Sequence, residues 1–224
     1  GYSSAASDVY KRQVMSGAAV SGMQVANGVQ SIASGGSAAA TVVSADGSLQ
    51  LNSGGIVSSL TLTSGTLELE NIDGGSFTVS GTLTANDAVI NMVDSSVTRA
   101  GTPAYETLTI DKLSGSGTTF VMETNLADET NSDKITITDA DTNATHYVQI
   151  KDLSKLNGVE VTGAHQQLLI TDASGKLTFE GKEFNAGGLW DVDPTLAKQG
   201  NDWYLTKIAK TANNDCLLYT SPSP

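Results

Sequence analysis

Cysteine is nearly absent from this sequence: the single one, Cys216, lies close to the C-terminal end. A disulfide framework needs pairs of cysteines, and thiol chemistry needs a cysteine within the fold, so both are excluded for the rest of the chain. The sequence also has no apolar run of about 18 residues, the length that a membrane-spanning helix requires. It therefore offers no transmembrane helix.

Basic residues and aromatics are scarce as well. The chain has 12 Lys and Arg against 24 Asp and Glu, a net charge of −12. From Val14 to Thr98 there is no basic residue, and Phe77 is the only aromatic. Nucleic acids and anionic membrane surfaces are bound by basic patches. The composition therefore excludes both as partners.

The two ends of the chain can be encoded by DNA sequences that are reverse complements of each other. One codon choice for Asp8 to Gln13 is GATGTGTATAAGAGACAG, and its reverse complement, read one base in, encodes Cys216 to Thr220. Both ends also resemble a translated transposase sequencing adapter. We interpret residues 1–13 and 216–224 as adapter-derived and exclude them from fold reasoning. The remaining fragment loses its cysteine, and its net charge becomes −13.

Glycine recurs at a fixed interval near the start of the chain. One series returns at every nineteenth position, and a second runs between its members: Gly17, Gly36, Gly55 and Gly74, then Gly28, Gly47 and Gly65. A period near 20 is typical of stacked repeat folds. We expect these glycines at sharp turns, where glycine and asparagine tolerate a positive φ.

Apolar and polar residues alternate between the glycines, as in Leu49 and Leu51 or Leu67 and Leu69. Period two indicates strands with one buried face. Ile32, Leu51 and Leu69 recur at nearly the same interval as the glycines, so each would stack on its equivalent in the next repeat. The sequence therefore predicts an all-β parallel β-helix with about one rung per 19-residue repeat, neighbouring rungs lying ~4.8 Å apart.

The composition divides the native chain into two regions. Charges and aromatics appear from Arg99 onward, and Gly101 and Pro103 interrupt regular structure there. We predict repeat rungs over 14–105, a second set of rungs with a cap over 106–208, and the start of a linker over 209–215.

The second region resembles a known family. The segment LTIDKLSGSGTTFVMETNLADETNSDKITIT at 108–138 is similar to the C-terminal rungs of pertactin-like autotransporter passengers, and QGNDWYLTK at 199–207 is similar to their last strand. The Gly-Gly repeats before it look like those of AIDA-like adhesins and self-aggregating antigens. The matching residues are Gly117, Phe120, Met122, Thr124, Asn125, Leu126, Ser132, Asp133, Lys134, Ile135, Asn201, Trp203 and Tyr204.

This resemblance implies a right-handed, pectin-lyase-like β-helix whose C-terminal rungs fold first and template the rest. It also implies type V secretion through the periplasm, display at the outer membrane, and a translocator β-barrel in cis. The partners would be host cells or neighbouring bacteria, met through protein or glycan, or further copies of the chain.

A candidate calcium loop begins at Asp139. Asp139, Asp141, Asn143 and Thr145 match its opening, but Ala144 stands where the loop needs glycine, and Ile150 stands where it needs glutamate. We interpret the segment as a polar turn between strands and expect no metal site and no cofactor.

The sequence offers little for catalysis. His146 and His165 lie in no metal-binding motif, and no serine lies in a G-x-S-x-G frame. A polysaccharide lyase would need basic residues beside acidic calcium ligands, and Arg99 has no neighbouring carboxylate. We expect both histidines at the surface or in strands.

Trp190, Trp203 and Tyr204 have two interpretations. They are carbohydrate-stacking platforms or, as we favour, part of the core and its cap. Outward serines and threonines are likewise glycan acceptors or solvated strand faces, and we favour the second.

The sequence favours a non-enzymatic surface adhesin that acts in adhesion, autoaggregation or biofilm formation, with many weak contacts summed along a rod. Two alternatives stay open. The rod is the stalk of an autotransporter whose catalytic domain, such as a serine protease, lies upstream, or it is a purely structural surface stalk.

Overall fold

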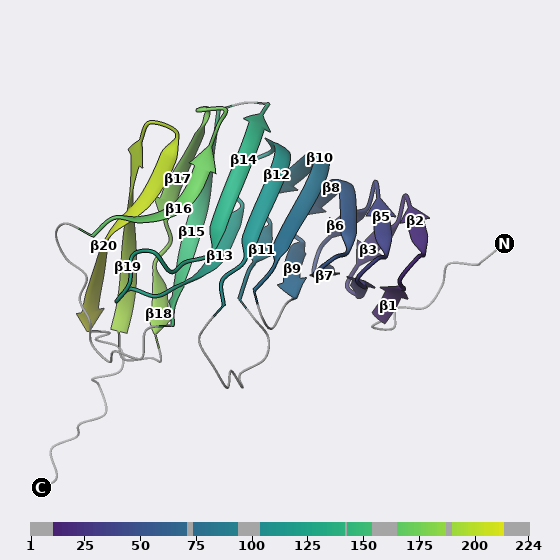
Figure 1. Cartoon of the computed structure of the whole chain (residues 1–224), viewed down its shortest axis with the longest axis horizontal. Coiled ribbons are helices and arrows are strands. Elements are labelled where there is room, and N and C mark those ends of the chain that lie inside the picture. The colour runs from purple at the N-terminus through teal and green to yellow at the C-terminus, as the bar shows by residue number, and fades with distance from the viewer. Residues whose placement is uncertain are drawn as a thin grey trace, which may run out of the picture.

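The computed structural model describes residues 11–70, 74–93, 104–141, 143–153, 165–186 and 190–212. All its regular elements are β-strands, which wind as successive turns along one axis (Figure 1). Among the described residues, no helix is long and apolar enough to cross a membrane.

The first sheet forms one wall of the rod, and its neighbouring strands all pair in parallel. Its eight strands are, in spatial order, β1 (Lys11–Val14), β4 (Val29–Ile32), β7 (Ser48–Asn52), β9 (Thr66–Glu70), β11 (Val89–Asn91), β13 (Thr119–Thr124), β15 (Ala144–Asp152) and β17 (Leu177–Gly181). Because spatial order follows chain order, every rung contributes one strand to this wall.

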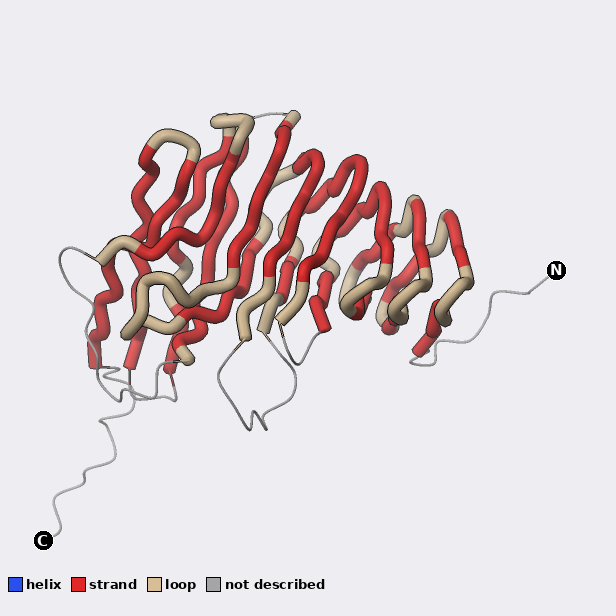
Figure 2. The backbone as a smooth tube through the Cα atoms, viewed as in Figure 1, coloured by secondary structure: helices blue, strands red, loops and turns tan. Residues whose placement is uncertain are grey.

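The second sheet forms the other two walls. Its parallel strands are β2 (Ala19–Ser21), β3 (Gln24–Ala26), β5 (Ser37–Ala39), β6 (Val42–Ser44), β8 (Ile56–Thr63), β10 (Ser76–Asn86), β12 (Thr107–Ser114), β14 (Lys134–Ala140) and β16 (Gln167–Asp172). β5 and β6 both pair with β8, so the two short strands of the early rungs merge into one long strand from β8 onward. Figure 2 shows the loops that connect the walls. Parallel connections of this kind wind right-handed, so the fold is a right-handed parallel β-helix.

Apolar side chains stack in columns inside the rod. Ile32 pairs with Leu51 and Leu51 with Leu69, which confirms the predicted register. A second column runs from β4 to β17, with apolar side chains between a buried Gln30 and Gly181: Gln30, Leu49, Leu67, Ile90, Phe120, Val148 and Gly181. The interval between paired residues stays close to that of the glycine series up to Leu69 and lengthens afterwards, since Ile90 pairs with Phe120. The 19-residue period therefore describes only the N-terminal rungs.

The corner glycines stack one residue away from the predicted 19-residue series. Gly17 donates its N–H to Gly35 O at 2.8 Å, and Gly35 donates to Gly54 O at 2.9 Å, so Gly17 stacks on Gly35 and not on Gly36. Gly17, Gly35, Gly54 and Gly74 have positive φ. The shift has a physical reason: Val14 pairs with Ile32, so the first rung is shorter by one position than the 19-residue period.

The other predicted glycines are needed for space. A Cβ on Gly36 would lie 2.7 Å from Val14 O, and one on Gly47 would lie 2.5 Å from Val25 O. A Cβ on Gly55 would lie 2.9 Å from Leu51 Cδ1, and one on Gly65 would lie 2.8 Å from Val43 Cγ1, which is also too close. The positive φ of the second corner belongs to residues before the glycines, Asn27, Ala45 and Ser64. Gly28 lies after Asn27, and its carbonyl accepts the Ser48 N–H at 2.8 Å.

The C-terminal end changes from parallel to antiparallel pairing. β18 (Phe184–Ala186), β19 (Trp190–Gln199) and β20 (Asp202–Ala212) follow β17, and β20 pairs antiparallel with β16 and with β19. This hairpin lies at the end of the stack, in yellow-green in Figure 1. We call β19 and β20 the cap hairpin.

Several predicted boundaries fall outside the described residues. They are residues 99–103 at the boundary between the two regions, residues 1–10 and 216–224 of the adapter-derived ends, and residues 213–215 of the linker. Residues 11–13 belong to β1, and residues 209–212 are the end of β20.

Candidate functional site

The segment that carries the family resemblance forms a closed loop between two walls. Residues 125–132, here called the 125–132 loop, leave β13 and lead to β14. Asn125 N donates to Asn131 O at 2.8 Å, and Thr124 and Ser132 form an antiparallel bridge at its base. Within the loop, Asn125 Oδ1 accepts the Ala127 N–H at 3.0 Å. The chain thus closes this corner with its own polar groups.

Gln167 anchors the loop from the next rung. Its side chain is fully buried, and Nε2 donates to the carbonyl oxygens of Asn125, Asp128 and Asn131 at 3.3, 3.4 and 2.8 Å. His165 lies beside it, with Nε2 3.3 Å from Gln167 Oε1 and Nδ1 3.2 Å from Glu129 Oε1. Sequence reasoning missed Gln167, because nothing in the sequence places a residue near a loop some 40 positions earlier.

The other residues of the motif divide between the core and the corner. Phe120 and Met122 are fully buried in the core, and Leu126 is 5% exposed. Ser132 Oγ donates to Leu168 O at 3.0 Å, which adds a second link to β16. Gly117 has a φ of 74°, and a Cβ there would approach Asp87 Oδ1.

Three buried carboxyl groups meet at this corner. Glu106, Glu123 and Asp133 are 0%, 1% and 0% exposed. Asp133 Oδ1 accepts the Glu106 N–H at 2.9 Å, and Oδ2 accepts the Glu123 N–H at 2.7 Å. Burial raises the pKa of Asp133 to about 7 although both amide hydrogen bonds favour its charged form. Glu106 and Glu123 were not predicted as site residues.

Lys134 follows Asp133 and remains partly buried. Its Nζ donates to Ser132 Oγ at 3.2 Å and to the carbonyl of Ser132 at 3.4 Å. Burial lowers the pKa of Lys134, and the charge of Asp133 partly opposes this effect.

The aromatic residues of the second region line the core. Phe120, His146 and Phe179 have ring centroids about 6 Å apart, and Phe179 meets Trp203 edge-on at 5.6 Å. Trp203 is 7% exposed, which confirms the core interpretation for this residue. Tyr204 is half-buried in β20, and the side chain of Trp190 lies outside the described residues. Asn201, in the turn of the cap hairpin, accepts the Asp172 N–H at 2.8 Å through its carbonyl.

His146 lies in strand β15, where it is completely buried. Neither of its ring nitrogens has a hydrogen-bond partner. Desolvation lowers the pKa of His146 to about 4. A neutral imidazole packed against the rings of Phe120 and Phe179 contributes to the core.

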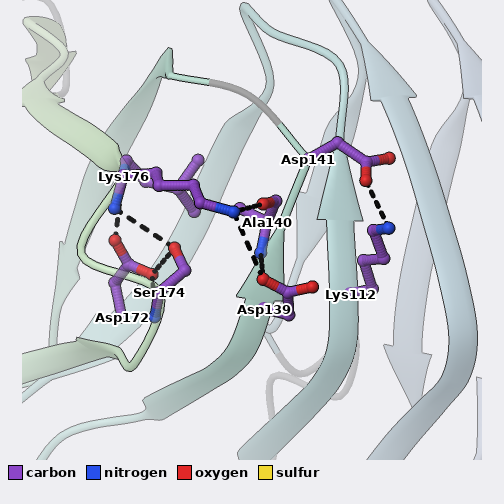
Figure 3. A network of polar contacts seen from close by, with 8 residues as sticks. Lys112, Asp139, Ala140, Asp141, Asp172, Ser174 and Lys176 are labelled. Carbon is purple, nitrogen blue, oxygen red and sulfur yellow. Dashed lines mark hydrogen bonds and ion pairs between the residues drawn. The ribbon is translucent and has the colours of Figure 1, made fainter.

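Lysines from neighbouring rungs pair with the carboxylates of the candidate calcium loop (Figure 3). Lys112 forms an ion pair with Asp141, and Lys176 Nζ lies 3.5 Å from Asp139 Oδ1 and also donates to Ala140 O. The Ala140 N–H donates to Asp139 at 2.8 Å and lowers the pKa of that carboxyl. Among the described residues, no group of three His, Cys, Asp or Glu side chains is arranged to hold a metal ion.

We expect millimolar calcium to leave the thermal unfolding temperature unchanged to within about 1 °C, because a ligand stabilises only a protein that binds it. The carboxylates of Asp141 and Asp139 are already paired with the ammonium groups of Lys112 and Lys176. Differential scanning calorimetry with calcium and with a chelator checks this. A rise of several degrees that Asp141→Asn abolishes would contradict it.

The outer surface carries ordered rows of hydroxyl groups. Thr78 pairs with Thr109, Thr109 with Thr136, and Thr136 with Thr171, one threonine per rung of the second sheet. Thr78 and Thr136 are exposed, and the other two are half-buried. We call these four residues the threonine row. Strand pairing fixes their separation at about 4.8 Å per rung.

Comparison with known proteins places the chain in a family. A family model described as Pertactin matches residues 57–207, which begins well before the motif at 108–138. Among solved structures, the crystal structure of the Haemophilus influenzae Hap adhesin is similar, with 20% sequence identity and a TM-score of 0.51. The match covers 88% of this chain and 22% of the Hap chain, so this chain spans about a fifth of the length of the Hap adhesin. No curated protein sequence matches. At this identity the Hap likeness shows a shared fold, and the family match, which covers most of the sequence, shows that the chain belongs to the pertactin family of autotransporter passengers.

Proposed function

We propose that this chain is a non-enzymatic part of a bacterial surface adhesin. Its β-helical rod makes contact with host cells, neighbouring bacteria or further copies of itself, and the protein reaches the outer surface through the periplasm. Support comes from the pertactin family match and from the shared fold with a protein named as an adhesin.

The observation that carries this proposal is the threonine row. Thr78, Thr109 and Thr136 present hydroxyl groups in register on one wall, and Thr171 continues the row with its hydroxyl donating to Asp202 Oδ1 at 2.7 Å. Each hydroxyl adds a weak contact, but many contacts on one rigid surface add up through multivalency. A flat array of this kind suits another extended surface better than a small molecule, which binds in concave pockets.

The experiment displays the full chain on a non-adherent bacterial host and measures settling of the cells, attachment to cultured epithelial cells and biofilm mass. We expect at least one of these to rise clearly above that of the host alone. No increase in any of the three would reject the adhesin proposal and favour a structural stalk.

A pair of variants locates the contact surface. Thr109→Asp with Thr136→Asp adds charge to the threonine row without entering the core, because both side chains point outward. Thr145→Asp with Thr178→Asp adds the same charge to paired outward residues of β15 and β17 on the other sheet and is the matched control. We expect the first pair to reduce attachment about tenfold, and the control to retain it. Equal loss in both pairs would remove the threonine row from the proposal.

A further inference from the structure

Three backbone carbonyl groups of the 125–132 loop converge on one side chain. The N–H groups of Asn125, Asp128 and Asn131 donate in a ring, each to the carbonyl oxygen of another member of this trio, at 2.8 to 3.0 Å. The same three oxygens accept the Gln167 amide, and each carbonyl has a second lone pair for this bond. The loop therefore closes around a nitrogen that belongs to β16.

Residues 165–168, here called the 165–168 segment, contact the loop without forming a strand ladder with it. The pairing of β16 with β14 begins only at Ile170. Before that point, Gln166 N donates to Glu129 Oε1 at 3.1 Å, and the Gln167 side chain donates to the loop carbonyls. Closure of the loop therefore depends on where the 165–168 segment lies.

The cap hairpin holds the 165–168 segment in place. Gln167 pairs with Leu205, and Leu168 pairs with Tyr204, both antiparallel in β20. In the described part of the chain, β20 is the only strand that pairs with this segment. The segment thus lies between the cap strand on one side and the loop on the other.

We propose that the 165–168 segment couples the cap hairpin to the 125–132 loop, so that the loop is closed while β20 is paired and opens when β20 leaves. Loss of β20 frees the segment, and the Gln167 amide then leaves the loop carbonyls. The exposed tip of the loop, residues 127–130, loses the contacts that fix it. The tip therefore keeps one conformation only in a chain whose cap is docked.

The contacts of Gln167 dominate the closure because they are buried. Residues 127–130 are exposed, and hydrogen bonds that are open to solvent break with little cost in free energy. The Gln167 side chain is fully buried, and a buried polar group without its partner costs far more than an exposed one. We therefore expect the loop and the 165–168 segment to open together.

Native-state hydrogen exchange of the full chain in low concentrations of urea tests this coupling. We expect the amides of Asn125, Asp128 and Asn131 to exchange through the same opening as the amides of β16 and β20. Their protection should then agree to within about threefold and fall with the same dependence on urea. Loop amides that exchange faster than those of β16, and without dependence on urea, would overturn the proposal, because the loop would open by itself.

Gln167→Met removes the amide and keeps a side chain of similar length. We expect the exchange of the three loop amides to accelerate about tenfold or more, while the amides of β10 and β12 keep their protection. Gln166→Met is the matched control, since this neighbouring side chain is exposed and its backbone N–H still reaches Glu129. Equal protection of the loop in both variants would overturn the proposal. If Gln167→Met fails to fold, the urea series on the unmodified chain decides alone.

Discussion

Gly181→Ala is expected to detach the cap hairpin and to lower the free energy of unfolding by about 3 kcal/mol or more. Gly181 ends the inner column that includes Phe120 and Val148, and a Cβ at this position would lie 1.7 Å from the carbonyl oxygen of Pro194 in β19. No rotamer avoids this contact, because the backbone fixes the position of a Cβ and its partner is a backbone oxygen. The cap must move away, and with it the edge contact between Phe179 and Trp203.

Chemical denaturation followed by tryptophan fluorescence measures the change, and Gly200→Ala is the matched control. Gly200 lies in the turn of the same hairpin with a φ of 63°, and no heavy atom lies within 4 Å of the position that its Cβ would take. Only backbone strain acts there, so we expect a loss of about 1 kcal/mol. Equal losses in the two variants would show that the close approach at Gly181 does not hold the cap.

Much of the fold was predictable because each stacked rung repeats the same pattern of apolar residues. The alternation in Leu49–Leu51 and Leu67–Leu69 and the spacing of Ile32, Leu51 and Leu69 determine both the buried face and the register. The apolar pattern of a single rung would leave the strand register ambiguous, but equivalent apolar residues in several rungs determine it. The family motif then identified the C-terminal rungs, although their spacing is irregular.

The corner glycines show the limit of a fixed period. Gly17, Gly35 and Gly54 stack, while the 19-residue ladder pairs Gly17 with Gly36. The first rung is one residue shorter, and this shortening lies in a turn. It therefore shifts the corner glycine while the strands keep their register. In a Gly-Gly pair, composition alone does not say which glycine carries the positive φ and which one faces a neighbouring backbone.

The polar corner was hidden from the sequence for a different reason. Glu106, Glu123, Asp133 and Gln167 are charged or polar residues, which are normally exposed. Only the fold reveals that they are buried and bonded to segments far away in the chain. Sequence reasoning found Asp133 through the family motif, but not the residues that give its carboxyl group an unusual environment.

His146→Leu is expected to stabilise the protein and to make its stability rise as the pH falls from 7 to 5. The pKa of His146 is lowered from 6.5 to about 4, so the unfolded chain binds a proton that the folded protein refuses between these values. Stability is therefore lost as the pH falls from 6.5 to about 4, by about 3 kcal/mol in total for this difference in pKa. Leucine has no polar atom to bury, and removing two unpartnered nitrogens should add about 1–2 kcal/mol at neutral pH.

The two buried groups act in opposite directions over the same interval. As the pH falls from 6.5 toward 4, His146 costs stability, while the raised pKa of Asp133 adds it. We therefore expect the unmodified chain to change little between pH 7 and 5, and His146→Leu to become more stable at pH 5 than at pH 7. Urea unfolding at both values measures the difference, with His165→Gln as the control, because His165 has partners in Glu129 and Gln167 and lies outside the aromatic core. A His146→Leu variant that is no more stable at pH 5 than at pH 7 would show that the imidazole of His146 is not the group that opposes Asp133.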